Sequence, residues 1–322
     1  MSDKCKAYSV AKKAAVAAVC VAGAEYLLAE LVYRNTLTRA AVNKKPYERL
    51  NDPSVQSRYV LHEDLRLSDD WYMYSNIRRL SLVSLRGETL HADMVESEAE
   101  SHKWLLCIHG WTSCPRSMAI YGHAYYNKGY NIVFPYLRGH RSSEQNLVSM
   151  GLKDRYDMVD WIKYIVTMDP LAQIVIHGVS MGSATTMLVT GEDLPDNVKC
   201  AVADCGYTSV ADQFSAVAKM YHIPPHPVVE IINLISIVRD GSNLFECRPV
   251  DAVKKSRTPT LFIHGMNDKF VPPAMVEKVF AACSAPKDMM LVPDAEHAES
   301  AETHPEMYWP KVWEFVDKYV HD

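Results

Sequence analysis

Three residues far apart in the sequence are of types that together perform nucleophilic catalysis. The first is Ser180, which stands between two glycines in the pattern Gly178-x-Ser180-x-Gly182, after a short apolar run and before a stretch of small residues. This pattern is typical of a serine on a sharp strand-to-helix turn that lifts the hydroxyl clear of the sheet. Residues two before and two after such a serine crowd one another, so glycine is expected at both positions. The pattern predicts that Ser180 is a nucleophile.

The other two residues are a base and an acid that would activate Ser180. A serine hydroxyl is a weak nucleophile at neutral pH and needs a base, whose tautomer a third group must hold. His297 follows the last strand-like run, and Asp268 follows the run before it, which gives the order serine, acid, histidine expected for this kind of serine. Asp204, at the end of an earlier run, is the alternative acid. We predict Asp268, because the apolar residues 270–272 can pack its loop against the core.

Backbone N–H groups are expected to stabilise the negative charge that develops on the substrate oxygen, and two donors are needed. We predict Met181, which follows the nucleophile, and Trp111, which follows the first parallel strand. The Trp111 side chain is expected to line the substrate site or to have a packing role only, and the loop residue His140 is expected to line the site. Three further histidines directly precede a glycine at a strand end and are expected to make local hydrogen bonds: His109, His177 and His264.

Alternating strands and helices must position these residues. Six near-continuous apolar runs are typical of strands covered on both faces: 104–110, 131–137, 173–180, 198–205, 259–265 and 288–294. Helical patterns separate most of them, the clearest over 151–170, and residues 75–96 resemble an antiparallel hairpin. The sequence therefore predicts an α/β fold with a mostly parallel central sheet and helices on both faces. Functional residues gather at the carboxyl ends of such strands.

One segment, about residues 209–255, interrupts the alternation. It contains apolar helical stretches and a proline-rich turn between two predicted strands. A connection of this length is usually functional or a small subdomain. We therefore expect a helical lid over the site, with Met220 and Tyr221 contacting the substrate. An additional helical layer without contact to the site is the alternative.

The first 44 residues form a separate part of the predicted organisation, ahead of a catalytic domain at 45–322. Four lysines near the amino end precede an apolar span at 14–33, which Glu25 and Glu30 interrupt. Such a span fits a membrane anchor, a soluble or interfacial helix, or a cleaved secretory signal. The residues do not decide between these three interpretations. They therefore also leave open whether the protein is membrane-associated or cytoplasmic.

The composition excludes some partners and cofactors. The 322 residues are 48% hydrophobic and 23% charged with a formal net charge of -5, which suits a large globular domain and does not favour nucleic-acid binding. Eight cysteines are scattered mostly through apolar runs and predict free buried thiols. Cys107, His109 and Cys114 lack a second pair at zinc-site spacing, so we expect no metal and no cofactor. The sequence leaves the oligomeric state open.

Motifs around these residues resemble the α/β-hydrolase superfamily: HGWTS at 109–113, LRGH at 137–140, HGVSMG at 177–182 and HGMNDKFVP at 264–272. The similarity extends over about residues 45–320 and looks most like the bacterial serine-aminopeptidase-like or monoglyceride-lipase-like branch, related to prolyl-oligopeptidase catalytic domains. It implies an α/β-hydrolase fold with Ser180, Asp268 and His297 as the catalytic triad. Members of this branch often carry an N-terminal hydrophobic helix, which favours the anchor reading.

Two positions depart from the usual pattern of this branch. An acid often precedes the Leu-Arg pair of LRGH and a glycine often follows its histidine, where this chain has Tyr136 and Arg141. Met266 replaces the first acid of a common G-D-x-D loop, which leaves Asp268 as the one carboxylate and supports its assignment. The first departure changes the rim of the pocket, so the resemblance carries no substrate preference.

Residues and resemblance together predict a serine hydrolase that cleaves small-molecule carboxylic esters through an acyl-enzyme on Ser180. A peptidase or amidase, and a thioesterase or lipase, would use the same triad. A binding module of a different class, a non-catalytic homologue, is the remaining alternative. Such homologues usually lose a triad residue, whereas this chain keeps all three.

Overall fold

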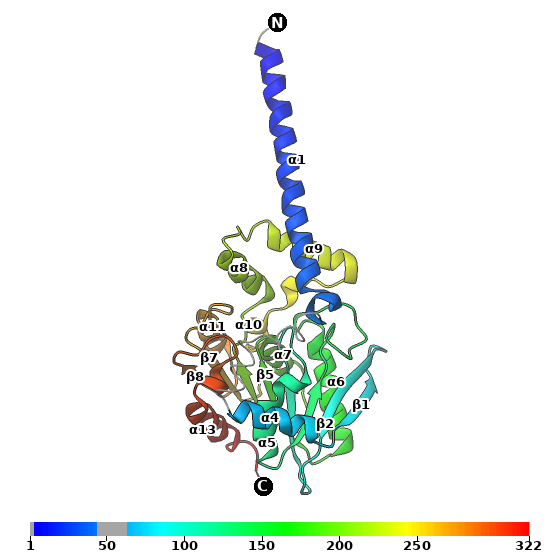
Figure 1. Ribbon diagram of the computed structural model, residues 1–322, viewed down its shortest axis with the longest axis vertical. Coiled ribbons are helices and arrows are strands. Elements are labelled where there is room, and N and C mark those ends of the chain that lie inside the picture. The colour runs from blue at the N-terminus through cyan, green and yellow to red at the C-terminus, as the bar shows by residue number, and fades with distance from the viewer. Residues whose placement is uncertain (1–2, 44–62, 322) are drawn as a thin grey trace.

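An eight-stranded sheet runs through the described part of the chain (Figure 1). The computed structural model describes residues 3–43 and 63–321, with side chains from residue 19 onward. The strand order is β1-β2-β4-β3-β5-β6-β7-β8. Only β1 and β2 pair antiparallel with their neighbours, and the other strands are parallel. The mostly parallel α/β sheet predicted from the sequence is confirmed.

Six of these strands coincide with the predicted apolar runs, and β1 and β2 with the hairpin predicted over 75–96. Their bounds are β1 Arg78–Val83, β2 Thr89–Val95, β3 Lys103–Ile108, β4 Asn131–Pro135, β5 Gln173–Val179, β6 Val198–Asp204, β7 Thr260–Gly265 and β8 Lys287–Val292. Every residue of β4 and β7 is buried. This is the burial expected of strands covered on both faces, because neither side chain direction then reaches water.

Helices cover the two faces of the sheet. On one face lie α6 (Asp154–Met168), α7 (Met181–Thr190), α10 (Pro249–Ala252) and α11 (Ala274–Ala282). The other face is covered by α4 (Glu63–Tyr74), α5 (Ala119–Tyr126) and α13 (Pro305–Val316). Short helices η1 (Pro115–Met118) and α12 (Ser300–Thr303) lie in loops that follow strands. The helix predicted over 151–170 is confirmed as α6, whose apolar residues face the core.

The segment predicted as a lid forms three helices and a short turn. These are α8 (Val210–Met220), α9 (Val228–Asp240), η2 (Leu244–Glu246) and α10. In Figure 1 α8 and α9 stand at the end of the body from which α1 projects. That this segment acts as a lid stays a prediction.

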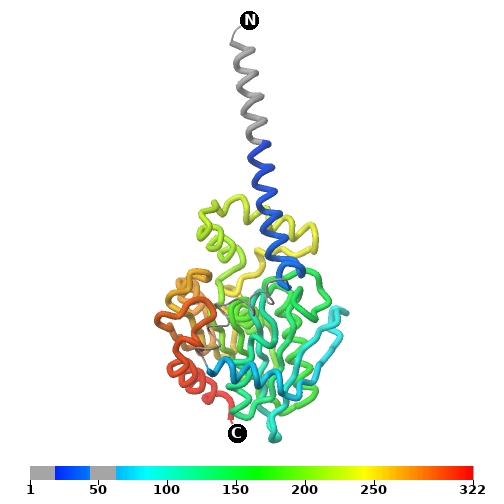
Figure 2. The backbone as a smooth tube through the Cα atoms, viewed as in Figure 1, coloured from blue at the N-terminus to red at the C-terminus, as the bar shows by residue number. Residues whose placement is uncertain are grey.

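The long helix α1 (Asp3–Thr36) leads away from the body (Figure 1), and the coloured tube in Figure 2 follows its part from residue 19 onward. The last turns of α1 and the residues after it pack against the body. Ala29, Tyr33, Leu37 and Val42 are buried in the same hydrophobic core as residues of α6 and α7. Residues 29–43 therefore pack with the body. The predicted domain start at residue 45 lies outside the described residues.

No helix within the described residues has both the length and the apolar character needed to cross a membrane. The membrane anchor, the interfacial helix and the cleaved signal all stay predictions.

Candidate active site

Ser180 lies on the turn between β5 and α7, with φ of 58° and ψ of -118°. A Cβ atom added at Gly178 would lie 2.2 Å from the carbonyl oxygen of Gly182, and one added at Gly182 would lie 2.0 Å from the carbonyl oxygen of Ile108. The crowding predicted across this turn is confirmed, and it leaves room only for glycine at both positions. The Ser180 N–H donates to the carbonyl oxygen of Asp204 at 2.9 Å, which fixes the turn to β6.

His297 bridges Ser180 and Asp268. Its Nε2 lies 2.8 Å from Ser180 Oγ, and its Nδ1 lies 2.7 Å from Asp268 Oδ2. Asp268 follows β7, and its other oxygen accepts the backbone N–H groups of Phe270 at 2.9 Å and Val271 at 2.8 Å. The structure thus brings the three predicted residues together at the carboxyl ends of β5, β7 and β8. This arrangement can pass a proton from hydroxyl to imidazole while the carboxylate holds the ring.

The surroundings of Asp268 favour its ionised form. Burial raises the pKa of this carboxyl, but hydrogen bonds from His264, His297 and the Val271 N–H outweigh that effect and lower the pKa to about 2. The ring of Phe270 lies against His297, with centroids 4.9 Å apart. The residues after Asp268 therefore both bond its carboxylate and pack against the imidazole, which keeps a charged partner beside that ring at neutral pH.

Asp204, the alternative acid, faces a different set of groups. Its fully buried carboxylate accepts hydrogen bonds from the hydroxyls of Tyr308 at 3.0 Å and Ser300 at 3.4 Å. Tyr308 in turn lies 3.0 Å from His177 Nε2, and the Tyr125 hydroxyl lies 3.4 Å from His177 Nδ1. Asp204 thus connects α13 to the sheet, and His177 hydrogen bonds to residues of α5 and α13 that are distant in the sequence, not to local groups as predicted.

Asp204 is expected to make stability depend on pH. Burial raises its pKa from 3.8 to about 6, against the opposing hydrogen bonds of Tyr308 and Ser300. Because the folded protein then binds this proton more tightly than the unfolded chain does, the stabilisation is present below about pH 4 and is lost as the pH rises through about 6. Relative to the Asp204→Asn variant, the free energy of unfolding of the wild type should fall by about 3 kcal/mol over this range.

Urea unfolding of both proteins at several pH values between about 4 and 7 tests this expectation. The asparagine keeps an oxygen for the Tyr308 hydroxyl but does not titrate in this range. A difference between the two proteins that stays constant with pH would contradict the assignment.

The loop after β3 lies next to Ser180 and contains Trp111, whose backbone N–H is one of the two predicted charge-stabilising donors. A Cβ atom added at Gly110 would lie 3.3 Å from the Cβ atom of Ser180, so the loop runs directly against the nucleophile. The other predicted donor, the N–H of Met181, belongs to the first turn of α7, where N–H groups have no partner within the helix. Both predicted donors therefore come from segments that border the Ser180 hydroxyl.

Two buried histidines hold this loop. His140 Nε2 accepts the N–H of Thr112 at 3.2 Å, and its Nδ1 lies 2.9 Å from the Arg138 carbonyl oxygen. His109 Nε2 accepts the N–H of Leu137 at 3.1 Å, and its Nδ1 lies 2.8 Å from the Gly110 carbonyl oxygen. Burial lowers the pKa of His140 to about 4 and that of His109 to about 3. Both rings are therefore neutral at pH 7, and each can accept an N–H.

Residues 36–43, the N-terminal strap, hold the same region from outside. The carbonyl oxygen of Thr36 accepts the indole N–H of Trp111 at 2.8 Å. Arg39 donates to the carbonyl oxygen of Arg141 at 2.7 Å, and Asn43 Oδ1 accepts the N–H of Arg141 at 2.8 Å. Arg141 has a left-handed φ of 45°, at the position where the branch it resembles often has glycine. The strap's two hydrogen bonds support that conformation.

The cavity beside Ser180 has a volume of about 350 Å³. Its described walls come from the loop after β3, from η1 and α5, and from residues 297–302, with Leu65 and Asp69 of α4. Trp111 lines it as predicted, but His140 does not, because that ring is buried behind the loop. Met220 and Tyr221 are also absent from the described lining, and their side chains are 39% and 66% exposed at the end of α8.

Sequence reasoning missed several residues that do line this cavity: Met118, Ile120, Tyr121, Arg141 and Glu302. One signal was available for the first three, because they closely follow a strand that ends at the site. The contributions of Arg141 and Glu302 depend on how loops from distant parts of the chain meet.

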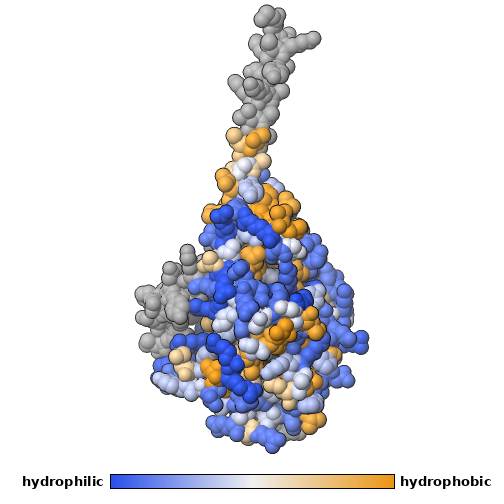
Figure 3. Space-filling model, turned by 90° about the vertical axis from the view of Figure 1, so that its right-hand side faces the viewer, coloured by the Kyte–Doolittle hydropathy of each residue, from blue (hydrophilic) through white to orange (hydrophobic). Residues whose placement is uncertain are grey.

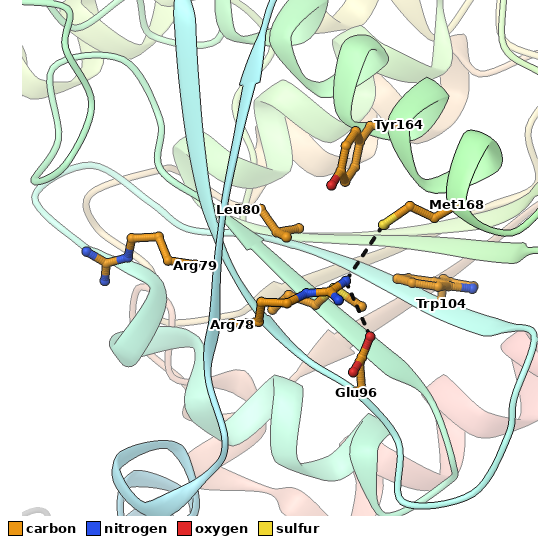
Figure 4. A pocket seen from close by; sticks show the side chains of 8 residues that line it. Arg78, Arg79, Leu80, Glu96, Trp104, Tyr164 and Met168 are labelled. Atoms are coloured by element: carbon orange, nitrogen blue, oxygen red, sulfur yellow. Dashed lines mark hydrogen bonds and ion pairs between the residues drawn. The ribbon is translucent and has the colours of Figure 1, made fainter.

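A second hollow of about 620 Å³ opens beside the edge strand β1 (Figure 4). Arg78 crosses it, with its guanidinium 3.3 Å from the sulfur of Met94, 3.9 Å from that of Met168 and 3.3 Å from a Glu96 oxygen. Its described lining has no residue in common with the Ser180 cavity.

One group of metal-binding residue types comes together among the described residues. Ligand atoms of Cys205, Asp268 and His297 lie within 4.8 Å of one another. The carboxylate and the imidazole already hydrogen bond to each other, so we assign no metal there. The described cysteines are free thiols, five of them buried.

Comparison with known proteins connects this geometry to a family. The family model described as the prolyl oligopeptidase family matches residues 119–322, a span that contains Ser180, Asp268 and His297. The uncharacterized protein YqkD of Bacillus subtilis is 26% identical over 215 residues, which cover 66% of this chain and 70% of YqkD.

Solved structures share the fold. An esterase of Pyrococcus furiosus, Pf2001, superposes with a TM-score of 0.65 at 19% sequence identity, over 78% of this chain and 94% of the esterase. An acylaminoacyl peptidase of Pyrococcus horikoshii superposes with a TM-score of 0.59 at 16% identity, over 78% of this chain and 43% of the peptidase. The resemblance to α/β-hydrolases related to prolyl oligopeptidases is confirmed.

Proposed function

Because the chain belongs to the prolyl oligopeptidase family and has the α/β-hydrolase fold, we propose that it cleaves carboxylic esters through an acyl-enzyme on Ser180. The protein is a serine hydrolase of this class. One observation carries the proposed residue roles. The imidazole of His297 lies within hydrogen-bond distance of both the Ser180 hydroxyl and the Asp268 carboxylate, as a serine nucleophile with its base and acid requires.

In the proposed reaction, His297 Nε2 takes the proton of Ser180 Oγ as the oxygen attacks the ester carbonyl carbon. The N–H groups of Met181 and Trp111 stabilise the oxyanion of the tetrahedral intermediate. The leaving alcohol then takes the proton from His297, and the acyl group stays on Ser180. Water attacks this acyl-enzyme with His297 again as the base, which releases the acid and restores the serine hydroxyl.

The cavity beside Ser180 favours an ester with an apolar acyl group. Its volume is in the range of small-molecule sites, and Met118, Ile120 and Tyr121 line one side of it. The acidic side chain of Asp69 is paired with Arg116 through two hydrogen bonds of 2.6 Å, so its charge is balanced within the protein. The three apolar residues suit an acyl chain, and the charged residues Arg141 and Glu302 line the cavity as well.

A peptidase or amidase is the second candidate. The family match and the acylaminoacyl peptidase among the structural neighbours favour it. The proposed chemistry is the same except that an amine leaves, so the substrate series below decides between them.

We expect a fluorophosphonate probe to label the wild-type protein on Ser180, because the phosphorus centre traps an activated serine. Ser180→Ala should not be labelled. Ser113 lines the same cavity, and Ser113→Ala is therefore the matched control that should still be labelled. Peptide mass spectrometry identifies the modified residue. Failure of the folded wild type to react, or equal labelling of Ser180→Ala, would favour the non-catalytic binding module.

The same preparation is then assayed with p-nitrophenyl esters of increasing acyl length and with p-nitroanilides of the same acyl groups. We expect kcat/KM to be higher for the esters at every length and to rise until the acyl chain fills the cavity. A higher kcat/KM for the anilides would favour the peptidase or amidase over the esterase as the proposed activity. The proposed roles of the triad residues would be unchanged.

A further inference from the structure

Exposed apolar side chains gather at the end of the molecule from which α1 projects. On α9 these are Leu234, Ile237 and Val238, the last with 76% of its surface exposed. Leu27, which is 68% exposed, and Leu31 lie on the part of α1 that emerges there. Figure 3 shows apolar side chains over α9 beside the base of α1. We name these five residues the α1–α9 face. Contiguous apolar surface of this kind usually marks an interaction site.

The exposed side chains of α9 form a stripe of their own. Positions 234, 237 and 238 have the spacing that puts residues on one side of a helix. A separate stripe, which includes Val229, Ile232 and Ile235, is buried against the body. α9 is thus apolar on two sides, and within the described residues only one of them is covered.

Ionic and aromatic contacts fix α1 relative to α9. Arg239 donates hydrogen bonds to both carboxylate oxygens of Glu30, at 2.8 and 2.9 Å. Its guanidinium also lies over the ring of Tyr33, 4.9 Å from the centroid. These charges are paired with each other, so they add little polarity to the face. Whatever covers α9 must therefore also accommodate the projecting α1.

We propose that the α1–α9 face rests on a lipid bilayer that contains anionic lipids. From this face α1 continues away from the body (Figure 1), and its sequence has no charged residue over 14–24. Beyond that stretch stand Lys4, Lys6, Lys12 and Lys13. Lipid accepts apolar helix surface, and anionic headgroups attract lysines near it. A bilayer therefore complements both the apolar face and the basic end of α1, and this inference does not depend on the proposed reaction.

Flotation of the full-length protein with vesicles tests the proposal. We expect flotation with vesicles of equimolar phosphatidylcholine and phosphatidylglycerol, and weaker flotation with phosphatidylcholine alone. A Leu234→Glu, Val238→Glu double variant should lower the partition coefficient by about tenfold or more, because it places two carboxylates where apolar groups would enter the lipid.

Leu171→Glu is the matched control. Leu171 is also 68% exposed, but it precedes β5 at the amino end of the sheet, away from α9. It should float like the wild type. Both variants should keep the wild-type melting temperature, because the replaced side chains are not packed in the core.

Two results would overturn the proposal. The first is a wild-type chain that floats with neither kind of vesicle. The second is a double variant that floats as well as the wild type, which would leave α1 alone to explain the association. If light scattering shows that the double variant loses a dimer while its flotation is unchanged, the face belongs to a second copy of the chain instead.

Discussion

Replacing His297 by alanine is expected to lower kcat for an ester substrate by about 10⁶-fold. The ring lies 2.8 Å from the Ser180 hydroxyl and 2.7 Å from the Asp268 carboxylate, so its removal takes away both the base and the link to the acid. KM should change little, because the imidazole acts on the reacting atoms. The side chain is 23% exposed, so the variant should fold. Initial-rate kinetics and thermal melting measure the two effects.

His304→Ala is the matched control for this experiment. His304 is a partly exposed histidine of the same region, which pairs with Glu306 on the surface, and its loss should leave kcat within about twofold. The Ser180→Ala, His297→Ala double variant should be no slower than either single variant, because the two residues act as a unit. A loss smaller than about tenfold in His297→Ala would show that another group serves as the base.

Gly182→Ala is expected to destabilise the protein by about 4 kcal/mol or more. Its Cβ atom would lie 2.0 Å from the carbonyl oxygen of Ile108 and 2.7 Å from that of His109. Both are backbone atoms of β3 and its following loop, so no side chain can rotate to relieve the overlap. The turn or the strand must move, and activity should be lost in the fraction that still folds. Urea unfolding and the ester assay measure both effects.

Gly23→Ala is the control for adding a methyl group elsewhere. A Cβ atom there meets nothing within 4 Å, and alanine favours a helix by about 1 kcal/mol over glycine. This variant should melt no lower than the wild type. If Gly182→Ala is equally tolerated, the close approach to the backbone of β3 is not the reason for the glycine.

The sequence predicted those parts of the site that depend on local structure. Gly178 is required by a contact across the Ser180 turn, which the spacing of the pattern indicated, whereas Gly182 is required by the backbone of β3, which lies far away in the sequence. The placement of Asp268 and His297 needed only the rule that parallel strands end at the same edge of the sheet. Each residue follows a recognisable buried strand, and the structure brings both to Ser180.

Contacts between distant segments could not be predicted in the same way. Met220 and Tyr221 belong to the segment expected to form a lid, but the large apolar residues of η1 and α5, which include Met118, Ile120 and Tyr121, line the described cavity instead. An apolar residue that packs a helix and one that faces a substrate look the same in a sequence. The two kinds of residue are distinguished only by the tertiary arrangement of the loops around the cavity.

The N-terminal strap is the clearest example of this limit. The apolar span at 14–33 was compatible with a helix, but nothing in the sequence linked Thr36 to the indole of Trp111 or Asn43 to Arg141. These hydrogen bonds join residues 75 and 98 positions apart. They depend on where α1 docks, which tertiary packing decides.

The link between Asp204 and Tyr308 connects the turn that carries Ser180 to α13, which forms late because ribosomes build the chain from its amino end. The Asp204 carboxylate receives the hydroxyl of Tyr308, and its carbonyl oxygen receives the N–H of Ser180. A nascent chain that has not been elongated past His297 lacks the imidazole. One that has not been elongated past Tyr308 lacks the hydroxyl that hydrogen bonds to Asp204, the residue that accepts the N–H of Ser180. Truncated chains that end before His297 should therefore lack the proposed activity.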